Sequence, residues 1–184
     1  DFNFLVARLA RRLGSRVFYY ISPQVWAWRS GRVRSLKRLV DQMAVILPFE
    51  PGFYDRYGME VKYVGHPLLD VLVEGSADEP ERTKYGGDSS KAIVGLLPGS
   101  RHSEIRSMLP LLLETAALMH RDLPEISFLL PVAATLDRNE IESQVAAWKL
   151  PVKVTSGDTY QMIRACDLVL TVSGTVTLEA AILG

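Results

Sequence analysis

The sequence predicts an α/β fold built on parallel sheets and divided into two parts. Short apolar runs rich in β-branched and aromatic residues alternate with segments of helical periodicity along most of the 184 residues. Such alternation is typical of βαβ units, in which a helix connects each strand to a parallel neighbour. The alternation is interrupted at residues 74–91, where Gly, Ser, Asp, Glu and Lys replace the large aliphatic residues. We therefore expect one domain over residues 1–68, a linker over 69–91 and a second domain over 92–184.

In the first domain the pattern predicts three strands and the helices between them. Each strand is a short apolar run that ends at a Pro or Gly signal, and the runs are 17–21, 43–47 and 61–64. Helical spacing predicts three helices, over 2–13, 26–39 and 49–57. The first of these is amphipathic, because its large apolar residues form one stripe and its arginines lie off that stripe.

In the second domain the same criteria predict four strands, each followed by a helix. The strands are expected at 92–97, 126–130, 152–155 and 168–172. The helices are expected at 103–120, 136–148, 160–165 and 175–183.

Composition excludes several classes of protein. With 48% hydrophobic and 23% charged residues, the chain is neither a disordered tail nor a disulfide scaffold. The single cysteine, Cys166, excludes an internal disulfide and a metal site made of several cysteines. No apolar run approaches the roughly 18–20 residues that span a membrane. HExxH, CxxC and GxSxG motifs are absent, which argues against metal-dependent hydrolysis and serine hydrolase chemistry.

The formal net charge of zero conceals an uneven distribution. Residues 1–50 contain nine basic and three acidic residues, a net charge of +6. The remaining 12 basic and 18 acidic residues give residues 51–184 a net charge of −6. Charge asymmetry of this kind indicates a partner that the total charge hides.

Two predicted strand-to-helix turns are suited to binding an anion. In the first, Gly99 permits close backbone approach, Ser100 supplies a hydroxyl and Arg101 supplies a bidentate donor for phosphate. Ligands of open α/β sheets bind beyond the carboxyl ends of the strands, which is where this turn is expected. Taken alone, such a turn is more often ordinary turn and cap chemistry.

The second turn, Ser173-Gly174-Thr175, leads into a helix whose free N–H groups and dipole favour a phosphate. Glu179, about one turn further on, could accept a hydrogen bond from a ribose diol. Hydroxyl residues are also common N-caps, so this turn too has a purely structural interpretation. Two such turns at strand ends of one sheet favour a nucleotide diphosphate.

Three features of the first domain have both a structural and a functional interpretation. Two tryptophans, Trp26 and Trp28, follow a strand end, and because residues two apart do not share a helix face, one ring is expected at a cleft or surface. The basic run at 29–38 is either a solvated helix face or a contact with phosphate or anionic lipid. His66 is either a hydrogen-bonded structural residue or a catalytic one.

Seven motifs together resemble one family, the lipid-A-disaccharide synthases, which are GT-B glycosyltransferases of outer-membrane biogenesis in Gram-negative bacteria. The motifs occur in the family's order, and the sequence carries them at 1–4, 21–29, 47–50, 53–54, 64–67, 97–101 and 173–179. The stretch Ser-Pro-Gln-Val-Trp-Ala-Trp at 22–28 is the one that we associate with this family alone. The chain looks like roughly the middle half of such an enzyme.

The resemblance implies a fold and a reaction. The fold is two Rossmann-like domains of the GT-B type, both incomplete in this chain. The reaction transfers a diacylglucosaminyl group from UDP-diacylglucosamine to diacylglucosamine 1-phosphate, with release of UDP and without metal or cofactor. The implied partners are the UDP-sugar donor, the acylated sugar-phosphate acceptor and an anionic membrane that the basic 29–38 face contacts. The implied location is cytoplasmic, peripheral to the inner membrane, and no nucleic acid is expected.

The resemblance also assigns roles to residues. Arg101, with Ser100 and Gly99, would hold the diphosphate and stabilise its charge. The Ser173-Gly174-Thr175 turn would cradle phosphate and Glu179 would bind the ribose. By analogy with related GT-B enzymes, the backbone at 156–157 (Ser156 and Gly157) would meet uracil. The acceptor-side candidates in the first domain are Asn3, Ser22, Gln24, Trp26 and His66.

The family's candidate base, an aspartate, lies a few residues before the point that corresponds to Asp1. We therefore expect a truncated chain that is inactive by itself. The alternatives that remain open are another UDP-sugar transferase or epimerase of the GT-B class, and a nucleotide-binding module without catalysis.

Overall fold

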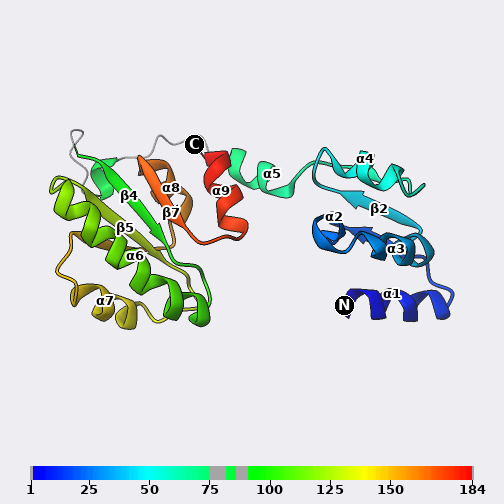
Figure 1. Cartoon of the computed structure of the whole chain (residues 1–184), viewed down its shortest axis with the longest axis horizontal. Coiled ribbons are helices and arrows are strands. Elements are labelled where there is room, and N and C mark those ends of the chain that lie inside the picture. Colours follow the sequence, from blue (N-terminus) through cyan, green and yellow to red (C-terminus); the bar gives the residue numbers. More distant parts are fainter. Residues whose placement is uncertain (1, 75–81, 86–90, 184) are drawn as a thin grey trace. The chain divides into compact units, whose positions relative to one another are not determined.

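The chain forms two compact α/β units, Asp1–Val71 and Leu72–Gly184. The computed structural model describes residues 2–74, 82–85 and 91–183, and Figure 1 shows both units. Helix α5 (Pro67–Glu74) runs through the point where the linker was expected to begin, and a short 3₁₀ helix, η3 (Arg82–Tyr85), lies within that predicted segment. The rest of the predicted linker, at 75–81 and 86–90, lies outside the described residues.

The first unit contains a three-stranded parallel sheet in the order β1-β2-β3. Its strands are β1 (Phe18–Tyr20), β2 (Gln42–Val45) and β3 (Lys62–Tyr63). Tyr19 pairs with Met43 and Val45 pairs with Tyr63. The predicted parallel α/β class is therefore confirmed for this unit, with strands shorter than the apolar runs suggested.

The prediction of a single helix over residues 26–39 is wrong. The chain instead forms α2 (Val25–Trp28), a 3₁₀ turn η1 (Ser30–Arg32) and α3 (Val33–Leu39). Arg29 separates the first two with φ −139° and ψ 44°, outside the helical region. The following Ser30 and Gly31 are weak helix formers, so nothing in the local sequence favours continuing the helix through this point.

The core of the first unit lies between β2 and the helices that cover it. Val33 and Leu36 of α3 pack with Met43 and Val45 of β2, and α4 (Glu50–Asp55) adds Tyr54. Helix α1 (Phe2–Arg12) contributes little to this core, because of its apolar residues only Phe4 packs against it and Ala7 is buried. The apolar stripe of α1 is 49–76% exposed at Phe2, Leu5, Val6 and Leu9.

The second unit contains a four-stranded parallel sheet in the order β6-β5-β4-β7. Its strands are β4 (Ile93–Leu97), β5 (Ser127–Val132), β6 (Val152–Ser156) and β7 (Leu168–Thr171). The chain runs outward from β4 through β5 to β6 and then crosses back to place β7 on the other side of β4. The connections that leave β4 and β7 therefore diverge, which creates the crevice where open α/β sheets bind ligands.

Helices cover both faces of this sheet (Figure 1). They are α6 (His102–Asp122), α7 (Arg138–Ala146), α8 (Thr159–Ala165) and α9 (Thr175–Leu183). Val94 and Leu96 of β4 pack with α6 and α7 on one face, whereas Ile93 and Leu97 pack with α8 and α9 on the other. This alternation within a fully buried strand is typical of parallel sheets covered on both sides.

The only cysteine lies directly after α8. The Cys166 thiol donates a hydrogen bond to the Met162 carbonyl oxygen at 3.1 Å, and a Cβ built on Gly95 of β4 would lie 3.1 Å from its sulfur. Burial raises the pKa of the Cys166 thiol to about 12. The cysteine is therefore a packing residue, and its thiolate is rare at neutral pH.

Candidate functional site

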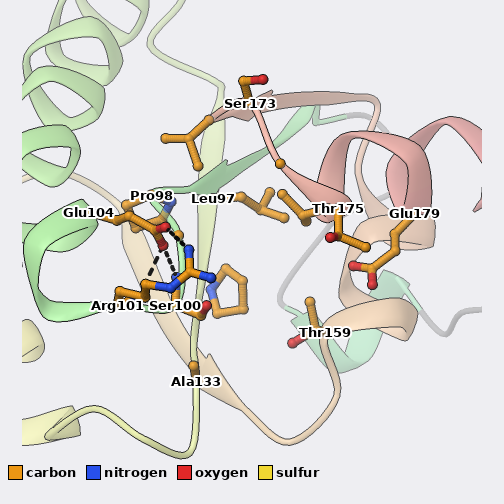
Figure 2. A pocket seen from close by; sticks show the side chains of 15 residues that line it. Leu97, Pro98, Ser100, Arg101, Glu104, Ala133, Thr159, Ser173, Thr175 and Glu179 are labelled. Atoms are coloured by element: carbon orange, nitrogen blue, oxygen red, sulfur yellow. Dashed lines mark hydrogen bonds and ion pairs between the residues drawn. The ribbon is translucent and has the colours of Figure 1, made fainter. Parts of the chain in front are cut away.

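A pocket of about 310 Å³ opens at the divergence of the β4 and β7 connections in the second unit (Figure 2). It brings together the two turns that the sequence singled out. The residues from these turns are Gly99, Ser100, Arg101, Ser173, Gly174 and Thr175, and Glu179 of α9 joins them. The structure thus places all seven at the carboxyl end of one parallel sheet.

The first turn is fixed by Glu104, a residue that the sequence reasoning missed. Its carboxylate accepts hydrogen bonds from the backbone N–H of Ser100 at 2.9 Å and of Arg101 at 3.1 Å, and it pairs with the Arg101 guanidinium. Gly99 makes this geometry accessible, because its φ of +109° is unfavourable for other residues. The spacing of Glu104, three residues after the N-cap Arg101, is the signal that could have identified it.

These contacts determine which donors the first turn offers to a ligand. The two backbone N–H groups are already bound to Glu104, so the remaining groups are the Ser100 hydroxyl and the Arg101 guanidinium, whose side chain is 77% exposed. The hydrogen bond from the Ser100 N–H, followed by that from the Arg101 side chain, holds the pKa of Glu104 below its usual value. Glu104 therefore stays ionised at neutral pH and orients Arg101.

The second turn forms the amino end of α9. The Thr177 hydroxyl accepts a hydrogen bond from the Gly174 N–H at 3.2 Å and lies 3.3 Å from the Val172 carbonyl oxygen, to which it donates. Thr177 is thus a capping residue, while Ser173 and Thr175 are exposed beside it. Figure 2 shows Thr175 and Glu179 on the α9 side of the pocket and Arg101 on the α6 side.

The Glu179 carboxylate accepts a hydrogen bond from a residue of α8. The Tyr160 hydroxyl lies 3.4 Å from one carboxylate oxygen of Glu179 and donates to it. Burial, together with the charge of Glu179, raises the pKa of Tyr160. The tyrosine holds the carboxylate in place at the pocket wall, where it can accept from a hydroxyl group of a ligand.

Ser156 and Gly157 are not among the residues that line the pocket. The Ser156 hydroxyl accepts a hydrogen bond from Arg138 at 3.1 Å, and Gly157 adopts a φ of +84°. Three lining residues that the sequence did not single out, Pro131, Ala133 and Thr159, come from the end of β5, the turn after it and the start of α8. They have no chemical signature in the sequence, and only the order of the strands would have identified them.

The acceptor-side candidates lie in the first unit. Asn3 donates to the Tyr19 hydroxyl at 3.5 Å, Gln24 is exposed, and Trp26 packs edge-on against the Phe49 ring. His66 Nδ1 accepts from the Leu68 N–H at 3.1 Å, which is a structural role at the start of α5.

Ser22 differs from the other acceptor-side candidates because only 6% of it is exposed. Its hydroxyl donates to Glu50 and does not face solvent.

The basic run at 29–38 is largely solvent-exposed in the structure. Arg29, Arg34, Lys37 and Arg38 are exposed, whereas the Arg32 guanidinium lies over the Phe4 ring at 5.6 Å from its centre. Arg32 therefore also packs α3 and its preceding turn against α1. This exposure is compatible with both interpretations of the run, a solvated helix face and a surface that contacts phosphate or anionic lipid.

The pocket combines one guanidinium with two carboxylates. Among the described lining residues, Arg101 is the single cation, and Glu104 and Glu179 are the anions. A guanidinium and a helix amino end are suited to phosphate groups, and a carboxylate is suited to sugar hydroxyls. Over residues 2–74, 82–85 and 91–183, no cluster of potential metal ligands is found and no helix is long and apolar enough to cross a membrane.

Two solved structures share the fold of this chain. A putative UDP-N-acetylglucosamine 2-epimerase from Listeria monocytogenes matches with a TM-score of 0.65 at 11% identity, over 96% of this chain and 50% of that one. A UDP co-structure of MnaA from S. aureus matches with a TM-score of 0.61 at 11% identity, over 98% of this chain and 52% of that one. At such identity the likeness concerns the fold alone.

The sequence comparisons identify a family. Relatives named lipid-A-disaccharide synthase from Trichlorobacter lovleyi and Geobacter sulfurreducens are each 48% identical to this chain over its whole length. A relative from Legionella pneumophila strain Lens, named lipid-A-disaccharide synthase 1, is 39% identical over 99% of the chain. The chain spans 48% of the length of each of these three relatives. The model of the lipid-A-disaccharide synthetase family matches residues 1–184, and the chain therefore belongs to that family.

Proposed function

We propose that this chain, as part of a protein of its relatives' length, contributes to the transfer of a diacylglucosaminyl group from UDP-diacylglucosamine to diacylglucosamine 1-phosphate. The observation that carries the proposal is the convergence of two anion-binding turns on one pocket at the switch point of the second sheet. Family membership supports the choice of substrates. The pocket would take the UDP part of the donor.

In the proposed reaction the acceptor hydroxyl attacks the anomeric carbon, and the bond to the diphosphate oxygen of UDP breaks. Negative charge then builds on the departing diphosphate. In this proposal Arg101 and the amino end of α9, which line the pocket together, stabilise that charge, and Glu179 is the acceptor for the ribose hydroxyls. The acceptor proton passes to a base that is not among the residues we assign.

Titration with uridine compounds tests the pocket itself. We expect the 184-residue chain to bind UDP about 10- to 100-fold more tightly than uridine, because charge-assisted hydrogen bonds contribute about 1.5–3 kcal/mol each. Isothermal titration calorimetry would measure both affinities, with ADP as a control for the base. Equal affinities for UDP and uridine would contradict a diphosphate site.

Product analysis separates the remaining alternatives. A protein of the relatives' length that uses acylated UDP-glucosamine, but not UDP-N-acetylglucosamine, acts as the proposed transferase. The reverse preference would indicate another UDP-sugar transferase or an epimerase. UDP binding without turnover of either compound would indicate a nucleotide-binding module.

We also propose that the basic 29–38 face contacts an anionic membrane at the cytoplasmic side of the inner membrane. The proposed substrates are acylated, so the reaction takes place at a lipid surface. The exposure of Arg34, Lys37 and Arg38 supports the proposal, since each basic residue near an anionic leaflet contributes about 1 kcal/mol.

Vesicle binding tests this face. The variant Arg34→Gln, Lys37→Gln, Arg38→Gln should bind vesicles rich in phosphatidylglycerol about 100-fold more weakly than the unsubstituted protein, the equivalent of about 3 kcal/mol. A matched variant that neutralises Arg106, Arg121 and Lys149, which are exposed in the second unit, should bind as before. Co-sedimentation measures the partition. Equal binding by all three proteins would show that the face is merely solvated.

A further inference from the structure

The first unit buries a glutamate at the carboxyl end of its sheet. Glu50 begins α4 and is only 2% exposed. One of its oxygens accepts a hydrogen bond from the Ser22 hydroxyl at 2.5 Å, and the other accepts from the backbone N–H groups of Ile46 at 3.1 Å and Leu47 at 2.8 Å. All three of these donors are neutral groups, and they compensate the burial of the carboxylate.

These contacts join two separate segments of the sequence. Ser22 belongs to the connection between β1 and α2, whereas Ile46 and Leu47 follow β2 directly. A second contact reinforces the junction, because the Trp26 and Phe49 rings meet edge-on with centres 5.0 Å apart. The loop that follows β1 is therefore attached to the segment that follows β2 by both a polar and an aromatic contact.

The loop is strained next to this junction. Ile21 adopts a φ of +62°, a left-handed conformation that is an outlier for a β-branched residue. Its N–H donates to the Ala44 carbonyl oxygen at 3.0 Å, and the adjoining Ser22 is bound to Glu50. Such strain persists only where the surroundings impose it, and it is concentrated at functional sites. Here it occurs beyond the carboxyl end of a parallel strand, which is the ligand-binding edge of open α/β sheets.

The strained turn leaves two side chains at the surface. Ile21 is 39% exposed and Gln24 is exposed, whereas Ser22 between them is buried. An amide such as that of Gln24 can both donate to and accept from sugar hydroxyls, and an adjacent apolar side chain can pack against a sugar ring.

We propose that Glu50 is a positioning residue for the acceptor sugar. Through Ser22 it holds residues 21–24 in the strained conformation that presents Gln24 and Ile21 to the hydroxylated ring. The proposal rests on the proposed transferase function and deepens it, because it assigns the acceptor-side role to the loop and not to the Ser22 hydroxyl itself. None of the residues that make this contact lines the proposed donor pocket of the second unit.

Steady-state kinetics of the protein at its relatives' length tests the role. Glu50→Gln and, separately, Ser22→Ala should raise the KM for the acceptor roughly 10- to 100-fold, as expected for the loss of a hydrogen bond to a charged group. The KM for the UDP-sugar and the Kd for UDP should stay within about twofold. Two variants are used because, if one of them fails to fold, the other can still contradict the proposed role.

Tyr57→Phe is the matched control. Tyr57 lies in the same unit, its side chain is exposed, and it does not contact Ser22 or Glu50, so removal of its hydroxyl should leave the acceptor KM unchanged. A loss of thermal stability in Glu50→Gln and Ser22→Ala without a change in acceptor KM overturns the positioning role, as does an equal rise in both KM values. Absence of transfer by the unsubstituted protein would instead overturn the proposed function and, with it, this inference.

Discussion

Replacing Arg101 with alanine, in the protein at its relatives' length, is expected to lower kcat/KM by about 10²- to 10³-fold, the usual effect of losing a donor that stabilises transition-state charge. Arg101 is the only cation among the described residues that line the pocket. Its guanidinium has five N–H donors, and pairing with Glu104 leaves others for a diphosphate. Steady-state kinetics with the UDP-sugar measures the loss, and calorimetry with UDP measures how much of it is ground-state binding.

Two further variants make the Arg101 experiment specific. Arg101→Lys keeps the charge but loses the planar fork, so its activity should fall between those of the alanine variant and the unsubstituted protein. Arg106→Ala removes the same residue type from an exposed position of α6 that does not line this pocket, and it should have no effect. If Arg101→Ala retained more than about a third of the activity, the stabilising role would be untenable.

Replacing Gly99 with alanine should destabilise the second unit by about 1–3 kcal/mol and weaken UDP binding. The φ of +109° at Gly99 is strained for any other residue, and the new Cβ would lie 2.7 Å from the Cβ of Glu104 and collide with its carboxylate. Glu104 would have to move, which would release the Ser100 and Arg101 N–H groups and the orientation of Arg101. Urea denaturation followed by circular dichroism measures the first effect, and calorimetry with UDP measures the second.

A second glycine of the pocket, Gly174, serves as the control for the Gly99 substitution. Gly174 lies in the second turn, its φ is outside the left-handed region, and a Cβ there would meet no atom within 4 Å. Gly174→Ala should therefore change stability by no more than about 0.5 kcal/mol. A similar loss in the two alanine variants would mean that the backbone of Gly99 is not the reason for its importance.

The sequence predicted elements best where burial dictates the pattern. The strand at 92–97 is found as β4 because an apolar run between polar residues has no alternative to the sheet interior. The helix at 26–39 failed for the opposite reason. The spacing of its apolar residues was correct, since Val33 and Leu36 lie in the core, but that spacing gave no sign of the break at Arg29. The periodicity of apolar residues shows which face of a helix is buried, but it does not show whether the helix axis is continuous.

The pocket was predictable where residue type alone limits the options. Glycine and hydroxyl residues at strand ends identified both turns, with Arg101 in the first, and their joint occurrence in one sheet pointed to a single site. Glu104 was missed, since an acid in the first turn of a helix is usually a dipole contact and its inward orientation depends on Gly99. The assignment of the Ser156 and Gly157 backbone to uracil was made by analogy and stays a prediction, although neither residue lines the pocket. The contact of the Ser156 hydroxyl with Arg138 depends on tertiary structure, which local sequence does not show.

The packing of Cys166 gives the molecule an internal reporter. As the sole cysteine, it lies in the second unit, with Gly95 behind it and a thiol that ionises only at high pH. A thiol reagent reacts with the thiolate, so the raised pKa of this half-buried thiol slows labelling in the folded state, and local opening around α8 accelerates it. The rate of labelling thus reports on the opening of the second unit around α8, without an engineered probe. A bound nucleotide that stabilises that unit would slow the modification in proportion to its affinity.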